Sequence, residues 1–334
     1  IRNQPPWHSS ERCSVWLQVV EKLLRMKQGE EVGIASFQPT VDVNGYDDQG
    51  QIPLLCAASG GHTETCKILL EYKADINLRK QNNGLSALHY ACEEGMVETA
   101  QLLVAHGADI NAAAQVTGDG GRMRGDLSTP LHSAAVAGQT EMVSKLLSGM
   151  VYNDVELQAE LDKKDGAGQT ALHRAAGKGG DDIIRILLDC GADLEAQDNS
   201  GETALFHAIS NRRIPAVEAL LEYGADANAV SAYGQTPMRI CAGVIHRLKT
   251  ILIAGGKFDR QQQVEEQEVS ILMECLTTHQ AVLDPKDRFF DLGVPSHLAG
   301  QSLEHFERLR NQAQGFGFIT NAVADEQRLF NQTR

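Results

Sequence analysis

Ala171-Leu172-His173-Arg174-Ala175-Ala176 is one copy of a short pattern that returns along the chain: Pro or Ala, then Leu, His, any residue and two small residues. The copies, three of them loose, begin at Pro53, Ala87, Pro130, Ala171, Ala204 and Pro237. The steps between these positions are 34, 43, 41, 33 and 33 residues. A regular period of about 33 residues indicates a repeat architecture, in which each unit is one supersecondary structure stacked on its neighbours. We therefore interpret the chain as an array of units.

A second pattern closes the units, with Gly-Ala-Asp followed by an aliphatic residue and, in most copies, Asn. Its copies are Ala74–Asn77, Gly107–Asn111, Gly191–Leu194 and Gly224–Asn228. A glycine here suits a helix C-cap with positive φ, and Asp and Asn side chains bond nearby backbone in tight turns. Another glycine lies three residues before most copies of the first pattern, and it turns the chain toward the next helix. The residues expected to cap those helices are Thr170, Thr203 and Thr236.

A period of 33 residues with Thr-Pro-Leu-His-x-Ala-Ala resembles the ankyrin repeat. The resemblance implies an all-α solenoid of helix-turn-helix units with β-hairpin-like loops and degenerate caps at both ends. We expect an N-terminal capping helix or degenerate repeat over 1–44, six repeats over 45–260, a degenerate seventh repeat over 261–294 and a C-terminal helical cap over 295–334. In the seventh repeat, Ser270–Leu276 aligns with the start of an inner helix.

Two steps exceed the period and place insertions near 112–127 and 148–164. Insertions in repeat proteins map to loops on one face, which is often the binding face. The first insertion is rich in glycine. A recognition role and a tolerated surface insertion both remain open for it, because long loops carry function but cost little free energy to keep.

Composition excludes several classes of function. The net charge of −14 argues against a general nucleic-acid binder, which must neutralise phosphates. Apolar stretches fall short of the ~20 residues that span a bilayer, so no membrane insertion is expected. The seven cysteines form no Cys-x-x-Cys pair and are interpreted as reduced thiols of an intracellular protein, cytoplasmic or nuclear.

Candidate chemistry is sparse. His89, His132 and His173 recur one repeat apart, about 10 Å, which is too far to share a metal ion at bonds of about 2 Å. The resemblance implies that such histidines bond backbone across neighbouring hairpins. Cys275 and His279 have the spacing of a nucleophile and its base on one helix, but no oxyanion element accompanies them, so a structural core thiol is favoured. We expect no catalytic residue, no metal site, no cofactor and no enzymatic activity.

The resemblance also implies a function, because in ankyrin-like proteins the hairpin tips and the inner helices face a partner. A protein or peptide is therefore expected to bind on this concave face. The positions that vary between repeats supply the candidate partner-binding residues: Tyr90, Glu93, Glu94, Arg174, Lys178, Asn211, Arg212, Tyr233 and Arg239.

Charge is uneven along these partner-facing positions. Glu93 and Glu94 make the second repeat acidic, and basic residues gather in the fourth to sixth repeats. A groove for an acidic or phosphorylated peptide and ordinary solvated charge are both compatible with this pattern. Two rival functions remain open: a targeting or substrate-recognition module of a larger enzyme, and an enzyme whose site lies in 260–334.

Overall fold

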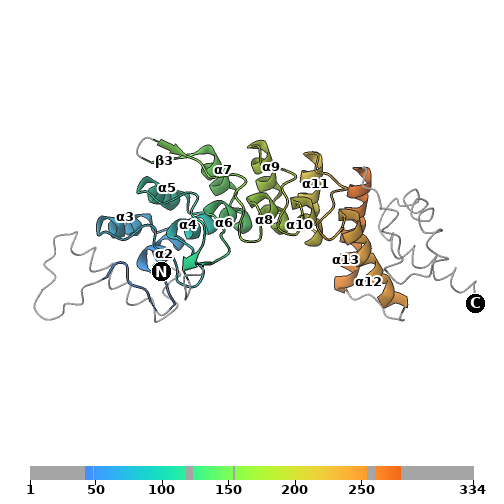
Figure 1. Cartoon of the computed structure of the whole chain (residues 1–334), viewed down its shortest axis with the longest axis horizontal. Helices are drawn as coiled ribbons and strands as arrows, with labels where there is room; N and C mark the ends of the chain where they lie inside the picture. Colours follow the sequence, from blue (N-terminus) through green and yellow to red (C-terminus); the bar gives the residue numbers. More distant parts are fainter. Residues whose placement is uncertain (1–41, 48, 118–122, 153–154, 254–259, 280–334) are drawn as a thin grey trace, which may run out of the picture. The chain divides into compact units, whose positions relative to one another are not determined.

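A computed structural model describes residues 42–47, 49–117, 123–152, 155–253 and 260–279 (Figure 1). The chain divides into two compact units. Unit 1 comprises Ile1–Ala175 and Arg185–Asp193, and unit 2 comprises Ala176–Ile184 and Leu194–Arg334. Helices α8 (Ala171–Lys178) and α9 (Asp181–Asp189) therefore contribute residues to both units.

Unit 1 is built from antiparallel helix pairs, each with a short inner and a longer outer helix. The pairs are α2 (Pro53–Ser59) with α3 (Thr63–Glu71), α4 (Ala87–Glu93) with α5 (Val97–Ala105), and α6 (Pro130–Ala137) with α7 (Thr140–Ser148). Helix α4 packs against both α2 and α6, and α5 packs against both α3 and α7. The leucine of each pattern lies in this core, as Leu54, Leu88 and Leu131 show. Stacking therefore buries the apolar face that one helix pair alone would leave in water.

Both insertions of unit 1 fold into two-stranded antiparallel hairpins. In the first, β1 (Val116–Thr117) pairs with β2 (Met123–Arg124), and in the second, β3 (Met150–Tyr152) pairs with β4 (Val155–Leu157). The β1–β2 hairpin is joined to its repeat by backbone hydrogen bonds, among them the one that Leu127 N donates to Ala114 O at 3.0 Å. Within the described part of the chain, strands are confined to these two insertions, and the all-α ankyrin class predicted from the sequence is confirmed.

The turn glycine and one threonine cap act as the sequence predicts. Gly84 has φ of 74°, and a Cβ atom there would lie 2.4 Å from Gln115 N, so only glycine fits this turn. Thr236 caps its helix by accepting a hydrogen bond from Arg239 N at 3.2 Å. Thr203 occupies the N-cap position with extended backbone, at φ −88° and ψ 172°, but its side chain makes no capping hydrogen bond, so only its position is as predicted.

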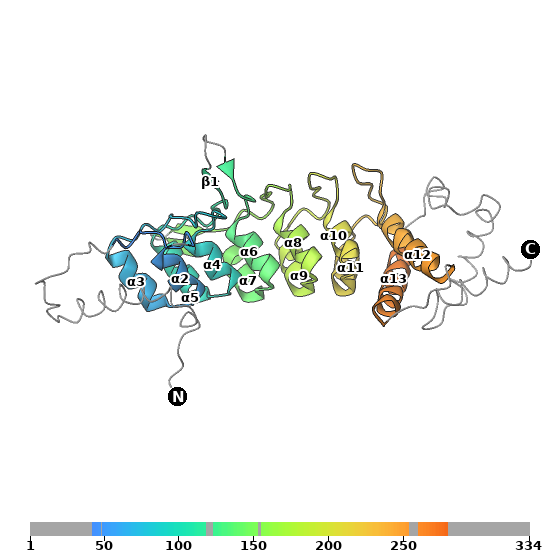
Figure 2. The ribbon, with the colours of Figure 1, turned by 90° about the horizontal axis from the view of Figure 1, so that it is seen from below.

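Unit 2 contains α10 (Ala204–Ser210) paired with α11 (Ile214–Glu222), and α12 (Pro237–Ile253) paired with α13 (Arg260–Thr278). Helix α10 packs against α12, and α11 packs against α13. Phe206, fully buried, takes the place of the pattern histidine. Figure 2 shows the loops that precede α10 and α12 projecting from the same side of these helices.

The expected start of a seventh repeat at Ser270 is wrong, because Ser270–Leu276 lies inside the continuous helix α13. No glycine or proline interrupts Arg260–Thr278, so nothing ends the helix before this stretch. Its apolar spacing has another cause: Val269, Leu272, Met273 and Leu276 are buried at intervals that put them on one helix face. Helix α13 is thus the outer helix of the pair that begins at Pro237. The expected caps, apart from residues 42–44, and residues 280–294 lie outside the described residues.

Truncating the pattern leucine should destabilise unit 2. Leu205 is 1% exposed on α10, so Leu205→Ala should lower the free energy of unfolding by about 2–5 kcal/mol. Ser210→Ala, at the exposed end of the same helix, is the control and should change it by less than about 0.5 kcal/mol. Urea denaturation followed by circular dichroism measures both. A near-zero cost for Leu205→Ala would contradict the helix register described above.

Candidate functional site

An aspartate near the start of the hairpin loop organises the turn in several repeats. Asp165 Oδ1 accepts hydrogen bonds from Ala167 N and Gln169 N, both at 2.9 Å. In unit 2, Asp198 Oδ1 accepts from Ser200 N at 2.8 Å and from Glu202 N at 3.0 Å. The first carboxylate oxygen thus holds the turn closed, and the second is available to another group.

Arg174 uses that second oxygen in unit 1. Its Nε donates to Asp165 Oδ2 at 2.8 Å, and its Nη2 also donates to this oxygen. The same Nη2 lies 4.0 Å from Asp126 Oδ2. The Asp165 side chain is 0% exposed, so this ion pair is where its charge is balanced. The sequence interpretation placed Arg174 on a surface available to a partner, whereas the structure commits its guanidinium to the hairpin. The position of Arg174 in the repeat predicted a side chain on the partner-facing side. It did not predict the ion pair with the carboxylate nine residues earlier.

The pattern histidines are structural, as predicted. His89 Nε2 lies 3.0 Å from Ser128 O, and His132 Nε2 lies 2.9 Å from Gln169 O, so each histidine reaches the next hairpin. Ser86 N donates to His89 Nδ1 at 3.1 Å, so the ring proton is on Nε2 and is donated to the carbonyl. His173 repeats the local half of this arrangement, with Nδ1 2.9 Å from Thr170 Oγ1.

Burial disfavours the charged form of these rings. Desolvation lowers the pKa of His89 to about 4, and the nearby Arg79 acts in the same direction, against the opposing effect of the Ser128 carbonyl. The pKa of His132 is lowered for the same first reason. Both imidazoles are therefore neutral donors in the folded chain near pH 7.

The three candidate residues of unit 1 lie on α4 or directly after it, and they differ in burial and charge. Tyr90 is half-buried, and Lys80 Nζ lies 5.8 Å from the centroid of its ring, within cation–π range. Glu93 and Glu94 are exposed at the C-terminal end of α4. Unit 1 therefore presents an acidic edge, as the sequence indicated.

In unit 2, Lys178 and Asn211 are exposed, but Arg212 is engaged. Its Nη1 lies 3.2 Å from Glu265 Oε1 and its Nε lies 3.0 Å from Glu268 Oε2. These side chains line a groove against α12 and α13 in which carboxylates balance the arginine charge. Like Arg174, Arg212 was expected to face a partner and is tied instead to acidic groups of the same chain.

The remaining candidates are Tyr233, in the hairpin before α12, and Arg239, in the helix itself. Tyr233 is 74% exposed at the hairpin tip, and Val230 in the same loop is 56% exposed. Arg239, in the first turn of α12, is half-buried.

Cys275 and His279 do not form a nucleophile with its base. His279 Nδ1 lies 2.8 Å from Cys275 O, so the imidazole contacts the end of the helix backbone. Burial and the charges of Glu218 and Glu274 raise the pKa of the Cys275 thiol, which suppresses the reactive thiolate. The sequence predicted a core thiol, whereas the Cys275 thiol is half-buried.

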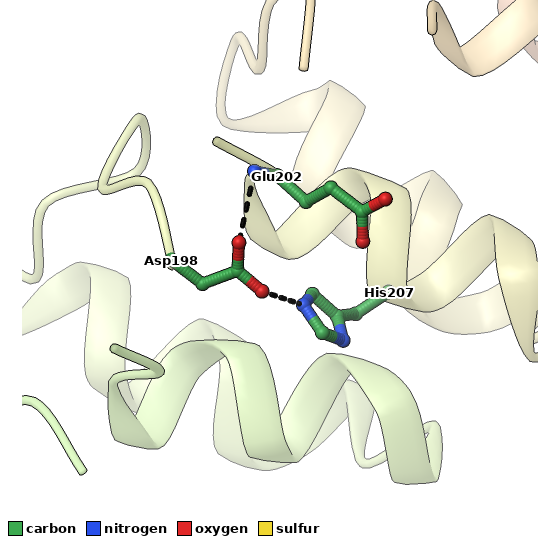
Figure 3. A group of neighbouring side chains, drawn as sticks. All are labelled: Asp198, Glu202 and His207. Atoms are coloured by element: carbon green, nitrogen blue, oxygen red, sulfur yellow. Dashed lines mark hydrogen bonds and ion pairs between the residues drawn. The ribbon is translucent and has the colours of Figure 1, made fainter. Parts of the chain in front are cut away.

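One cluster of unit 2 was missed by the sequence interpretation. Asp198, Glu202 and His207 converge at the foot of the hairpin before α10 (Figure 3). Asp198 Oδ2 lies 3.0 Å from His207 Nε2. Burial acts to raise the pKa of Asp198, but hydrogen bonds from Glu202 N–H, His207 and Ser200 N–H outweigh it and lower the pKa below its ordinary value. A comparison between repeats could have found this cluster, because two of its three positions differ from the preceding repeat. The equivalent residues 33 positions earlier are Asp165, Gln169 and Arg174.

Comparisons with known proteins agree with this architecture. A family model described as ankyrin repeats (3 copies) matches residues 16–114 and 118–198. Two models described as ankyrin repeats (many copies) match residues 187–241 and 88–147. The chain therefore belongs to the ankyrin-repeat family, whose members are generally protein-interaction modules and typically non-catalytic. No match was found among curated proteins. In the described part of the chain, no helix has the length and apolar character needed to cross a bilayer.

The pH dependence of stability should report the buried histidine. Because the pKa of His89 is about 4 when folded, the unfolded chain binds more protons between about pH 6.5 and pH 4. His89 therefore contributes a loss of stability as the pH falls through that window, with a slope of at most about 1.4 kcal/mol per pH unit. His89→Gln should flatten this slope in urea titrations at pH 7, 6 and 5, while the exposed control His106→Gln should not. An unchanged slope in His89→Gln would show that the ring is not held neutral by burial.

Arg174 should behave as a structural residue. Arg174→Glu removes a charge-assisted bond and faces buried Asp165 with a like charge, so unfolding should become easier by about 1.5–3 kcal/mol. Lys178→Glu is the control on the same helix and is exposed, so its effect should stay within about 0.5 kcal/mol. Urea denaturation compares the two. Equal stability of both variants would contradict the structural role of the Asp165–Arg174 pair.

Proposed function

We propose that the chain binds a partner protein or peptide through the hairpin tips and inner helices of unit 2. The observation that carries this proposal is Tyr233, which has the highest exposure of the large hydrophobic side chains in the described part of the chain, at 74%. Val230 extends the apolar surface in the same loop. Tyrosine is enriched among the residues that dominate binding energy at interfaces, because it covers a large area and retains a polar tip.

Exposed cations at the turns between the inner and outer helices of unit 2 favour an acidic or phosphorylated partner. Lys178 and Arg213 are exposed, and Arg213 Nε lies 3.4 Å from Gly177 O, so the two cations lie in adjoining turns. They stand out in a chain of net charge −14. Guanidinium groups bind carboxylates and phosphates with paired hydrogen bonds. The ion pairs of Arg174 and Arg212 place these two residues outside the contact set proposed for unit 2. From the candidates we keep Lys178, Asn211 and Tyr233 as its centre, and we add Arg213.

A displayed random-peptide library, selected against the immobilised full chain, tests this proposal while the identity of the partner is still open. The selected peptides should be enriched in Asp, Glu or phosphorylated residues. Their Kd, measured by fluorescence anisotropy, should rise by about tenfold or more in Lys178→Glu and in Tyr233→Ser, an effect of about 1.4 kcal/mol each. Binding should also weaken as salt rises, because exposed charges are screened over about 8 Å at physiological ionic strength.

The matched control is Tyr223→Ser, which removes a partly exposed tyrosine just after the end of the outer helix α11. It should leave the Kd within about twofold of the wild-type value, a difference of less than about 0.5 kcal/mol. Selection of basic peptides, or a loss of binding in Tyr223→Ser but not in Tyr233→Ser, would refute the assignment of this face.

A further inference from the structure

Asp198, Glu202 and His207 bring three possible metal-ligating atoms together at one point of unit 2 (Figure 3). One ligand atom from each residue lies within 4.8 Å of the others. The Asp198 side chain is 5% exposed and that of His207 is 18% exposed, so the cluster is largely withdrawn from water but still reachable.

The preceding repeat provides an internal comparison. Its three equivalent positions hold Asp165, Gln169 and Arg174, where the arginine closes an ion pair with the aspartate. Arginine has no lone pair to offer a metal ion, and it already supplies the positive charge that the carboxylate needs. In the later repeat, imidazole replaces that guanidinium and the amide becomes the Glu202 carboxylate. The same backbone frame thus carries a closed ion pair in one repeat and three metal-competent donors in the next.

We propose that Asp198, Glu202 and His207 form a binding site for a divalent transition-metal ion such as Zn²⁺. One imidazole nitrogen with two carboxylate oxygens is a donor set that Zn²⁺ accepts, and it leaves a fourth position for water. Ligand atoms around a tetrahedral ion at bonds of about 2.0–2.1 Å stand about 3.3 Å apart. The separation of 3.0 Å between Asp198 Oδ2 and His207 Nε2 is already close to that value. Binding then requires one Glu202 carboxylate oxygen, now within 4.8 Å of the other two ligand atoms, to come within the same range.

Binding is compatible with the hairpin. Asp198 Oδ1 keeps its bonds to Ser200 N and Glu202 N, since only Oδ2 is needed as the ligand. The ion takes the place of the hydrogen between Asp198 Oδ2 and His207 Nε2. That proton passes to solvent or, when the ring is neutral, to Nδ1. The ion also brings positive charge to the Asp198 and Glu202 carboxylates.

Titration of the full chain with Zn²⁺ alone, by isothermal calorimetry, tests the proposal against a variant that copies the preceding repeat. Glu202→Gln with His207→Arg restores the Asp, Gln and Arg set, so the hairpin should stay closed and the thermal midpoint should be kept. This variant should bind one equivalent of Zn²⁺ less than the wild type. Glu202→Gln alone, which leaves the Asp198–His207 hydrogen bond in place, should weaken the same binding step by tenfold or more. Unchanged stoichiometry and affinity in these variants would overturn the proposal.

The reverse exchange provides a second, independent measurement. Gln169→Glu with Arg174→His gives the preceding repeat the three proposed ligands and should add one equivalent of bound Zn²⁺. In the wild type, the imidazole ¹⁵N resonances of His207 should shift on Zn²⁺ addition. Failure of the exchanged repeat to gain an equivalent, or unmoved His207 resonances, would show that these three positions do not make a metal site.

Discussion

The hydrogen bond from a buried imidazole to the backbone of the next hairpin is the interaction on which the rest of unit 1 depends. A helix pair of this length cannot bury its apolar face alone, so each pair must be registered against its neighbour. His89 bonds to Ser128 O and His132 bonds to Gln169 O, so two successive junctions are made by the same chemistry. These bonds satisfy buried polar groups while the leucine and alanine positions supply the apolar contact. The neutral state of His89 is a condition of this arrangement, because a buried carbonyl needs a donor and the site disfavours a charge.

A second constraint acts at the hairpins, where one carboxylate serves two purposes. Asp165 and Asp198 both commit Oδ1 to two backbone N–H groups, which fixes the turn. Oδ2 then faces a position nine residues later, and this position differs between repeats: Arg174 in one and His207 in the next. The turn is therefore preserved while the chemistry beside it changes. The electrostatic consequence is that Arg174 and Arg212, which the repeat pattern places at partner-facing positions, are already paired with carboxylates of the chain.

Most of the fold could be predicted from the sequence, because its determinants recur with the repeat pattern. The leucine, histidine and glycine positions act within one repeat or on the next one along the chain, as Leu88, His89 and Gly84 do. The failures concern contacts that the repeat pattern does not contain. The buried stripe of α13 from Val269 to Leu276 has a spacing that inner and outer helices share, so the residues alone could not assign it. Arg212 pairs with Glu265, 53 residues away, and no repeat pattern encodes that contact.

The site was predicted less well than the fold for the same reason. Repeat position identifies which side chains can reach the surface, and it identified Tyr233, Lys178 and Asn211 correctly as exposed. It does not show which of them the chain already uses. A comparison between repeats supplies part of the missing information, because equivalent positions share one backbone frame. A difference between two copies, such as Arg174 against His207, then reflects chemistry rather than geometry.

This separation of frame and chemistry explains how a repeat protein can place a new ligand set without refolding. Exchanging two side chains beside a turn alters charge and donor type, while the turn keeps the bonds of Asp198 Oδ1 and the helix keeps its buried Leu205. The energetic cost is confined to one hairpin, since each repeat contacts only its neighbours. In a protein with one continuous core, the same exchange would disturb packing in many directions. A function that resides in one repeat can therefore differ from the function of the array, and the Asp198 cluster and the Tyr233 surface can act independently within unit 2.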